Sequence, residues 1–365
     1  MSEGSLRPEE GSSSQQAAVV AVDANGADLG PAEVAAGASL AAEQGARVLL
    51  FGPARELELS SSPPLGVEVV DAPVSIAKSA DPVRTARSTP AASIVQAARA
   101  VATGRAQALV CAGGTGAAVA AGLFNIKRAR GIHRPALALP LPIPGSPVTL
   151  LDVGANADAR KEHLVQFAFM GAALAQVVLG VRRPRVGLLS NGEEAERGSA
   201  LVVAARAELE ERMQAAGWLE LVGNVEGGDV TAGAADVIVT DGFTGNVALK
   251  LMEGVSQTML RAVREAAMSS PRAKLGGLLL RPALRGFRDE IDPEAHGGAY
   301  LLGLRSLGVV PHGRFTRRGF AQAILRAHRG ASEDLVGRTH AALEQAGALK
   351  LAPASVRASS LRPEE

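Results

Sequence analysis

Two short segments share the pattern Gly-x-Thr-Gly, at residues 113–116 and 242–245. Each follows an apolar run that predicts a strand and precedes a stretch that predicts a helix. Glycine lets the backbone approach a ligand closely, threonine adds a hydroxyl donor, and the first N–H groups of a helix attract anions. Both turns are therefore candidate cradles for a phosphate or an oxyanion. The pattern is weak by itself, because ordinary turn and helix-cap chemistry selects the same residues.

Most other predicted strands also end in polar residues or glycine. In an open α/β sheet, ligands collect beyond the carboxyl ends of the strands. We therefore expect the functional side chains at these tips, with ordinary turn chemistry as the alternative for each one. The tip residues are Asp23, Asn25, Asp28, Asp152, Gly154, Asn156, Asn191, Gly192, Glu193, Asp241, Thr244 and Asn246.

The elements that position these tips alternate along the chain. This alternation of short apolar runs with alanine-rich segments predicts an α/β fold, with a mostly parallel sheet covered by helices on both faces. The apolar runs are 18–23, 47–52, 66–71, 107–113, 147–154, 185–192 and 236–242. The helical segments are 31–45, 90–104, 161–180, 194–216 and 246–268.

Composition narrows the class of protein. The 365 residues carry 38 Lys and Arg against 37 Asp and Glu, and the net charge of +1 gives no global attraction to nucleic acid. The single cysteine, Cys111, rules out a disulfide framework, and its apolar neighbours predict a buried residue. No secretory signal or apolar run of about 18 residues is present, so we expect a soluble, cytoplasmic protein. Residues 1–16 and 353–365 predict disordered tails around a domain at 17–345.

No nucleotide, esterase or metal motif is complete. Gly114-Thr115-Gly116 is followed by Val119 where a dinucleotide fingerprint needs glycine or alanine, and no P-loop sequence occurs. The segment His-Gly-Gly-Ala at 296–299 has no accompanying Gly-x-Ser-x-Gly elbow. The six histidines lack the paired spacing of zinc sites, so we expect neither a metal nor a cofactor.

The segment 261–288 is locally basic. It carries seven Lys and Arg against one acid, Glu265, so its charge is 7 − 1 = +6. Three interpretations fit equally: a helical hairpin on an anionic membrane surface, a docking surface for an acidic carrier protein, and an oligomer contact with solvated arginines. The residues expected to make the membrane or carrier-protein contact are Lys274, Arg281, Arg285 and Arg288.

Nine sequence blocks follow the order and spacing of one known family. They are "VDANGADLGP", "AGGTGA", "RPALALPLP", "LDVGANADARKEHLVQFAFMGA", "LLSNGEEAERG", "LVGNVEGGDV", "DVIVTDGFTGNVALKLMEG", "HGGAYLLGL" and "HG....RGFAQAI". From Val19 to His328 the chain thereby resembles the phosphate acyltransferase family of bacterial phospholipid synthesis. The resemblance implies a homodimer with a three-layer α/β/α fold, two lobes and a cleft, as in phosphotransacetylase and the isocitrate and isopropylmalate dehydrogenases. It also implies a projecting helical hairpin at 255–290.

The same resemblance implies a reaction. A fatty acyl group would pass from acyl carrier protein to inorganic phosphate, and the acyl phosphate would serve a membrane glycerol-3-phosphate acyltransferase. Phosphate is already anionic and nucleophilic, so the site has only to position it and to stabilise an oxyanion. The residues expected to bind phosphate or the oxyanion are Gly113, Thr115, Gly116, Asn156, Arg160, Lys161, Asn191 and Thr244.

Three residues are expected to act in catalysis itself. Asp241, or alternatively Asp28, would orient a donor or handle a proton, and His312 would protonate the leaving thiolate. Asn246 would donate to the phosphate or to the oxyanion.

Several positions depart from the family's usual pattern. Asn25 and Ala27 stand where Met and Gly are usual, Gly114 and Ser190 each replace an Asn, and the segment 87–93 lacks a pair of lysines. A lost amide and two lost cations beside an anion site would weaken phosphate binding or change the acyl donor. The alternative is therefore a divergent non-catalytic or regulatory paralogue that binds acyl carrier protein or membrane.

Overall fold

The described residues of this computed structural model, 18–59, 63–145, 148–214 and 216–350, fold around one 11-stranded sheet. The predicted tails at 1–16 and 353–365 lie outside these residues. The strands follow the order β3-β2-β1-β4-β11-β10-β5-β6-β9-β7-β8 across the sheet. Their bounds are β1 Val19–Asp23, β2 Arg47–Gly52, β3 Val67–Asp71, β4 Ala108–Cys111, β5 Ala136–Leu141, β6 Val148–Leu151, β7 Arg185–Leu189, β8 Glu220–Val225, β9 Val237–Val239, β10 Ala299–Leu302 and β11 Leu307–Val310.

The two halves of the sheet run in opposite directions. Neighbouring strands from β3 to β11 are parallel, and so are those from β6 to β8. Between these halves, β10 is antiparallel to β11 and to β5, and β5 is antiparallel to β6. Three reversals leave β9 antiparallel in direction to β4, with four strands between them. The two Gly-x-Thr-Gly turns therefore leave their strands at opposite ends.

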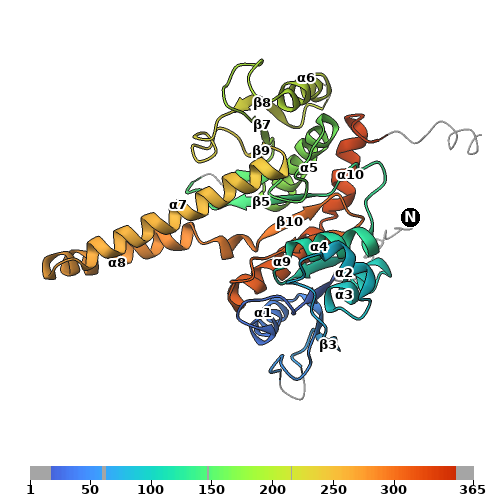
Figure 1. Ribbon diagram of the computed structural model, residues 1–365, viewed down its shortest axis with the longest axis vertical. Coiled ribbons are helices and arrows are strands. Elements are labelled where there is room, and N and C mark those ends of the chain that lie inside the picture. The colour runs from blue at the N-terminus through green and yellow to red at the C-terminus, as the bar shows by residue number, and fades with distance from the viewer. Residues whose placement is uncertain (1–17, 60–62, 146–147, 215, 351–365) are drawn as a thin grey trace, which may run out of the picture.

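Helices cover both faces of the sheet (Figure 1). One face packs against α1, α5, α6, α9 and α10, and the other packs against α3, α4 and the first turns of α7. The helix bounds are α1 Pro31–Glu43, α2 Pro82–Ser88, α3 Ser93–Ala102, α4 Thr115–Ala121, α5 Lys161–Leu179, α6 Ala200–Gln214, α7 Gly242–Met268, α8 Pro271–Glu290, α9 Arg317–Ser332 and α10 Leu335–Gln345. A π-helix, Gly122–Ile126, continues α4, and a 3₁₀ turn, Pro293–His296, precedes β10.

The layering follows from side-chain alternation along each strand. In β1, Val20 and Val22 face the layer of α1 and α9, whereas Ala21 faces the layer of α3 and α4. Helix α5 is long and apolar enough to cross a membrane, but 83% of that apolar window is buried inside the protein. We therefore assign α5 to the core of the fold.

Helices α7 and α8 form a hairpin that projects away from the body of the protein (Figure 1). The predicted hairpin, 255–290, lies within this longer one, which begins at Gly242. Large apolar side chains recur every four residues on α7 and are more than half exposed; they are Phe243, Val247, Leu251, Val255, Met259 and Val263. The isolated chain thus leaves an apolar face of the hairpin uncovered.

The predicted fold class is confirmed: the sheet is mostly parallel and lies between two layers of helices. All seven apolar runs contain a strand. The sequence-based prediction missed β5, β8, β10 and β11. Three of these are the strands that reverse the sheet or adjoin the reversal, and they are short or contain residues such as Pro140 and Gly308 that weaken the strand signal.

Candidate active site

The first Gly-x-Thr-Gly turn has unpaired donors. Gly113 and Gly114 have positive φ, which suits glycine, and Gly114 precedes α4 without any side-chain cap. Within the described part of the chain, the N–H groups of Thr115, Gly116 and Ala117 make no hydrogen bond. Thr115 and Gly116 are also exposed. A ligand oxygen can therefore reach backbone donors at this turn.

A second loop brings His312 to the same turn. A Cβ added to Gly113 would lie 3.3 Å from Gly313 Cα, and the carbonyl of Gly313 accepts a hydrogen bond from Asp28 N at 2.7 Å. His312 is exposed, and its Nδ1 accepts from Arg314 N at 3.1 Å. In the neutral ring the proton then lies on Nε2, which is left as a donor. His312 and Asp28 therefore belong to the first turn.

A buried carboxylate lies behind this turn. Asp23 is 2% exposed at the end of β1, and its Oδ1 accepts from Asn25 N at 3.1 Å. Burial raises the pKa of Asp23 to about 6, against hydrogen bonds from Ser93, Asn25 and Cys111 that lower it. Cys111 is buried, as predicted, and its Sγ donates to Gly113 O at 2.8 Å. The first turn therefore packs directly against the titratable carboxyl group of Asp23 and against Cys111.

The second Gly-x-Thr-Gly turn already contains an anion of its own. Asp241 caps α7: its Oδ1 accepts from Thr244 N at 2.8 Å and its Oδ2 accepts from Thr244 Oγ1 at 2.7 Å. Gly242 N donates to Asn156 O at 2.8 Å. Two of the first three N–H groups of α7 are therefore satisfied internally, and the hydroxyl of Thr244 is engaged as a donor.

Asp152 organises the loop beside the second turn. Its side chain is completely buried, and it accepts hydrogen bonds of 2.8 to 3.1 Å from the N–H groups of Leu137, Gly154, Ala155 and Asn156. The Asn156 amide nitrogen donates to Asp152 Oδ2 and to Pro135 O, at 2.8 and 2.7 Å. Burial raises the pKa of Asp152, although these donors oppose the shift. The side-chain N–H groups of Asn156 are therefore used to hold this loop, through Asp152 and Pro135.

The remaining candidate residues differ in their partners. Asn191, Asn246 and Arg160 are exposed, and within the described residues their side chains form no ion pair and make no hydrogen bond to another side chain. Lys161 instead forms an ion pair with Glu208 of α6, with Nζ and Oε2 3.2 Å apart.

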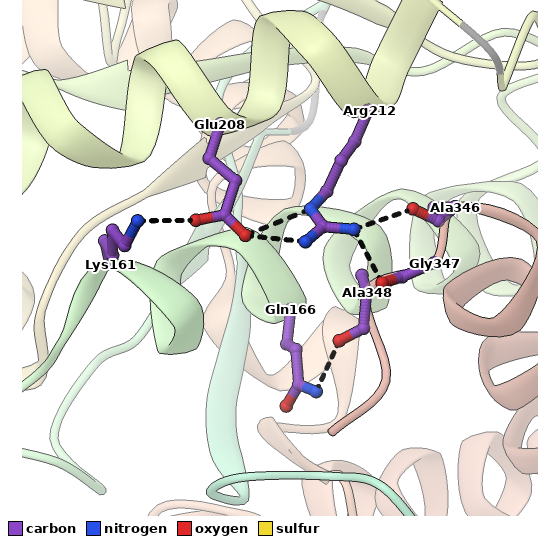
Figure 2. Close-up of polar contacts among 7 residues, drawn as sticks. All are labelled: Lys161, Gln166, Glu208, Arg212, Ala346, Gly347 and Ala348. Atoms are coloured by element: carbon purple, nitrogen blue, oxygen red, sulfur yellow. Dashed lines mark hydrogen bonds and ion pairs between the residues drawn. The ribbon is translucent and has the colours of Figure 1, made fainter. Parts of the chain in front are cut away.

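Glu208 also binds Arg212, whose guanidinium donates to the carbonyls of Ala346 and Gly347 (Figure 2). Burial raises the pKa of Glu208, but hydrogen bonds from Arg212 and Lys161 outweigh it and leave the pKa below its ordinary value. Lys161 therefore has a partner on α6 that the sequence did not indicate.

The candidate residues at the two turns form two groups, and the helices that follow the turns, α4 and α7, pack on the same face of the sheet. Gly113, Thr115 and Gly116 lie with His312 and Asp28. Asn156, Thr244 and Asn246 lie with Asp241, and a Cβ added to Gly154 would be 3.8 Å from Asn246 Cγ. No hydrogen bond among the described residues joins the two groups.

Sequence reasoning placed Asp152 at a strand tip without a specific role and gave no role to Glu208. For Asp152 a signal was present: an aspartate at a strand end with Gly154 and Asn156 following is typical of a turn whose N–H groups bind that carboxylate. For Glu208 the only local signal was Arg212, four residues later on the same helix, because its other partner, Lys161, is distant in sequence.

Comparison of the sequence with known proteins identifies relatives along most of the chain. The family described as "Fatty acid synthesis protein" matches residues 18–338. The phosphate acyltransferase of Nitratidesulfovibrio vulgaris is 43% identical over 311 residues, which cover 84% of this chain and 89% of that protein. The phosphate acyltransferase of Thermobifida fusca is 43% identical over 317 residues, covering 85% and 87%.

Solved structures show a similar fold at low sequence identity. The EutD phosphotransacetylase from Staphylococcus aureus has a TM-score of 0.56 and 17% identity, and covers 86% of this chain and 94% of its own. A phosphotransacetylase from Streptococcus pyogenes has a TM-score of 0.55 and 18% identity, covering 85% and 93%. The fold is thus shared with phosphotransacetylases, and the sequence matches show that the chain belongs to the phosphate acyltransferase family.

Proposed function

We propose that this protein transfers a fatty acyl group from acyl carrier protein to inorganic phosphate and releases acyl phosphate. The observation that carries the proposal is the first turn, where the N–H groups of Thr115, Gly116 and Ala117 have no partner among the described residues and lie beside His312. Membership of the phosphate acyltransferase family supports phosphate as the anion and acyl transfer as the reaction class.

The reaction needs no enzyme nucleophile. A phosphate oxygen attacks the thioester carbonyl, and the new P–O–C bond forms as the carbonyl becomes a tetrahedral oxyanion. The carbon–sulfur bond then breaks, and the proton of the attacking hydrogen phosphate passes to the thiolate, which accepts a hydrogen bond from Nε2 of His312 as it leaves. The backbone donors of the first turn hold phosphate through the attack.

The second group has a different part in the proposal. Because the Asp241 carboxylate occupies the start of α7, this turn is a poor phosphate site. Its Asn246 amide is exposed and stands next to the Asp152–Asn156 loop. We assign Asn246 to the oxyanion of the tetrahedral intermediate, and Asp241 to the orientation of Thr244.

The basic hairpin fits the remaining partners. Lys274, Arg281 and Arg285 are exposed on α8, and Arg288 follows on the same helix. We propose that this hairpin contacts the acidic carrier protein and an anionic membrane, where a glycerol-3-phosphate acyltransferase consumes acyl phosphate. A cytoplasmic, membrane-peripheral homodimer completes this proposal, since a second copy would cover apolar surface of α7.

Phosphate dependence tests the reaction. Purified protein is mixed with an acyl carrier thioester, with and without inorganic phosphate, and acyl phosphate is trapped with hydroxylamine. We expect the thioester to be consumed only when phosphate is present. Turnover without phosphate, or no turnover at all, would contradict the proposal, and retained carrier binding without turnover would favour a non-catalytic paralogue.

Vesicle flotation tests the membrane contact separately. The triple variant Arg281→Glu, Arg285→Glu and Arg288→Glu should no longer float with vesicles that contain anionic phospholipid, while the wild type floats. Neutral vesicles are the control, because they lack the charge that attracts the arginines. Equal flotation of the variant would rule out these arginines as the membrane contact.

A further inference from the structure

The segment 72–77 packs directly over the first turn. A Cβ added to Gly114 would lie 3.0 Å from Ala77 Cα and 3.1 Å from both Ala77 Cβ and Ala77 O. A Cβ added to Gly26 would lie 3.1 Å from the same Ala77 Cβ. Ala77 is therefore wedged between the two glycine-containing tips of β1 and β4, and no side chain fits at position 114 unless this segment moves.

Asn25 is the residue that fixes the segment. Its Nδ2 donates to Ala72 O at 2.9 Å and to Ser93 Oγ at 3.1 Å, and its carbonyl accepts from Ser75 Oγ at 2.9 Å. Its own N–H donates to Asp23 Oδ1. One asparagine thus connects Ala72 and Ser75 of the segment to the tip of β1.

Ser93 and Ser75 extend the connection. Ser93 N and Oγ both donate to Val74 O, at 2.9 and 3.3 Å, so the start of α3 also contacts the segment. Ala77 N approaches Ser75 Oγ at 3.4 Å. The Asn25 side chain thus binds Ala72 directly and reaches Val74 through Ser93, whereas the Asn25 backbone carbonyl reaches Ala77 through Ser75.

We propose that Asn25 is a positioning residue for phosphate binding: it holds Ala77 against Gly114, and Asn25 and Gly114 act as one coupled pair that shapes the first turn. The proposal rests on the proposed function, because it takes phosphate to be the ligand of that turn. It accounts for two departures from the family pattern at once. An amide at position 114 would need the space that Ala77 fills, and the amide at position 25 fixes the segment that carries Ala77 through Ala72 and Ser93.

The test is a double-mutant cycle with inorganic phosphate as the probe. Asn25→Leu keeps the side-chain size and removes its donors, and it should raise the Kd for phosphate about 10-fold while kcat changes less than about 2-fold. Gly114→Asn should also raise this Kd by about 10-fold, because Ala77 blocks the new side chain. In the Asn25→Leu background the same Gly114→Asn change should cost less than about 3-fold, since the released segment can move.

A matched control uses Asn125, which is also partly buried and donates to a helix carbonyl, Ala121 O, at 2.8 Å. Asn125→Leu should leave the phosphate Kd unchanged. Hydrogen exchange adds a readout that is independent of phosphate: amides of residues 74–79 should exchange faster in Asn25→Leu than in the wild type or in Asn125→Leu.

The outcomes separate this inference from the proposed function. Additive effects of the two substitutions on Kd, or unchanged exchange at 74–79 in Asn25→Leu, would overturn the coupled pair. Calorimetric phosphate binding does not require turnover, so a wild type that binds phosphate without transferring an acyl group would refute the proposed reaction and leave the cycle informative. A wild type that binds no phosphate would overturn both.

Discussion

The two Gly-x-Thr-Gly turns share three of their four residues in the same order but present opposite electrostatics. In the first, Gly114 precedes the helix and Thr115 is its first residue. In the second, Asp241 precedes the helix and Gly242 is its first residue, so Thr244 falls in the third position. The threonine of the pattern is therefore the first residue of the helix in one turn and the third residue in the other. The first turn offers N–H groups that have no partner among the described residues. In the second turn, the carboxylate of Asp241 accepts a hydrogen bond from Thr244 N.

A pattern of anion-binding residues is therefore informative only together with its position relative to the helix start. A threonine at the third position satisfies an aspartate cap through its N–H and hydroxyl. A threonine at the first position after an uncapped glycine leaves both groups available to a ligand. Each turn also lies near a buried aspartate, Asp23 or Asp152, and these two differ in how many donors surround them.

The largest expected effect concerns Asp152. Asp152→Ala should lower the free energy of unfolding by about 4 kcal/mol, because several buried N–H groups lose their acceptor. Urea denaturation measures this change. The control is Asp229→Ala, which removes one acceptor for Glu226 N in a turn and should cost less than about 1 kcal/mol. Equal costs would mean that water replaces Asp152 in the loop.

Asn246 tests whether the second turn contributes to catalysis without binding phosphate. Asn246→Ala should lower kcat about 100-fold or more, equivalent to roughly 3 kcal/mol, which is the scale for losing one oxyanion donor. Its KM for phosphate should change little, since phosphate is held at the first turn. Ser256→Ala, at an exposed position of the same helix, is the control. An unchanged kcat would remove Asn246 from the catalytic residues.

The pH dependence of stability at Asp23 tests the difference between the two buried aspartates. Its pKa rises from 3.8 in a free side chain to about 6 in the protein, so folding favours the protonated form. The stability from this group is complete below about pH 4 and is lost as the pH rises through 6. The asparagine in Asp23→Asn does not titrate. Between pH 4 and pH 7, the free energy of unfolding of this variant should therefore rise relative to that of the wild type by up to about 3 kcal/mol. A pH-independent difference in urea denaturation would contradict the shift.

Asp241 tests the internal cap. Asp241→Ala should lower the free energy of unfolding by about 1 kcal/mol, because Thr244 N loses its acceptor. Asp241→Asn keeps a capping oxygen and should recover most of that loss, as measured by chemical denaturation. If Asp241→Asn is as destabilised as Asp241→Ala, the charge of the carboxylate matters more than its hydrogen bonds.

The smallest effect is expected at Lys161. Its side chain is 48% exposed and its ammonium pairs with Glu208, so Lys161→Met should cost less than about 1 kcal/mol of stability. The KM for phosphate should stay within about 2-fold of the wild type, whereas Arg160→Met, which removes an unpaired cation, should raise it by more. A large rise for Lys161→Met would show that Lys161 leaves Glu208 to bind phosphate.

Much of the fold was predictable because it depends on local patterns. The apolar runs that became β1, β2, β4 and β9 are short, rich in valine or leucine, and bounded by turn residues. The reversal through β10 and β5 was not predictable, because antiparallel pairing with residues more than a hundred positions away has no local signal. The prediction of tips along a parallel sheet therefore missed that β4 and β9 point in opposite directions.

The site divides in the same way. The residue types at the predicted strand ends, including the glycines and threonines of the two turns, can be read from the amino-acid sequence alone. Only the tertiary structure decided which of these groups remain free. Lys161 and Asn156 are occupied by Glu208 and by Asp152 with Pro135, whereas Thr115 is open. The physical reason is that strands and helices follow from local periodicity, whereas a donor's availability depends on which distant groups fold against it.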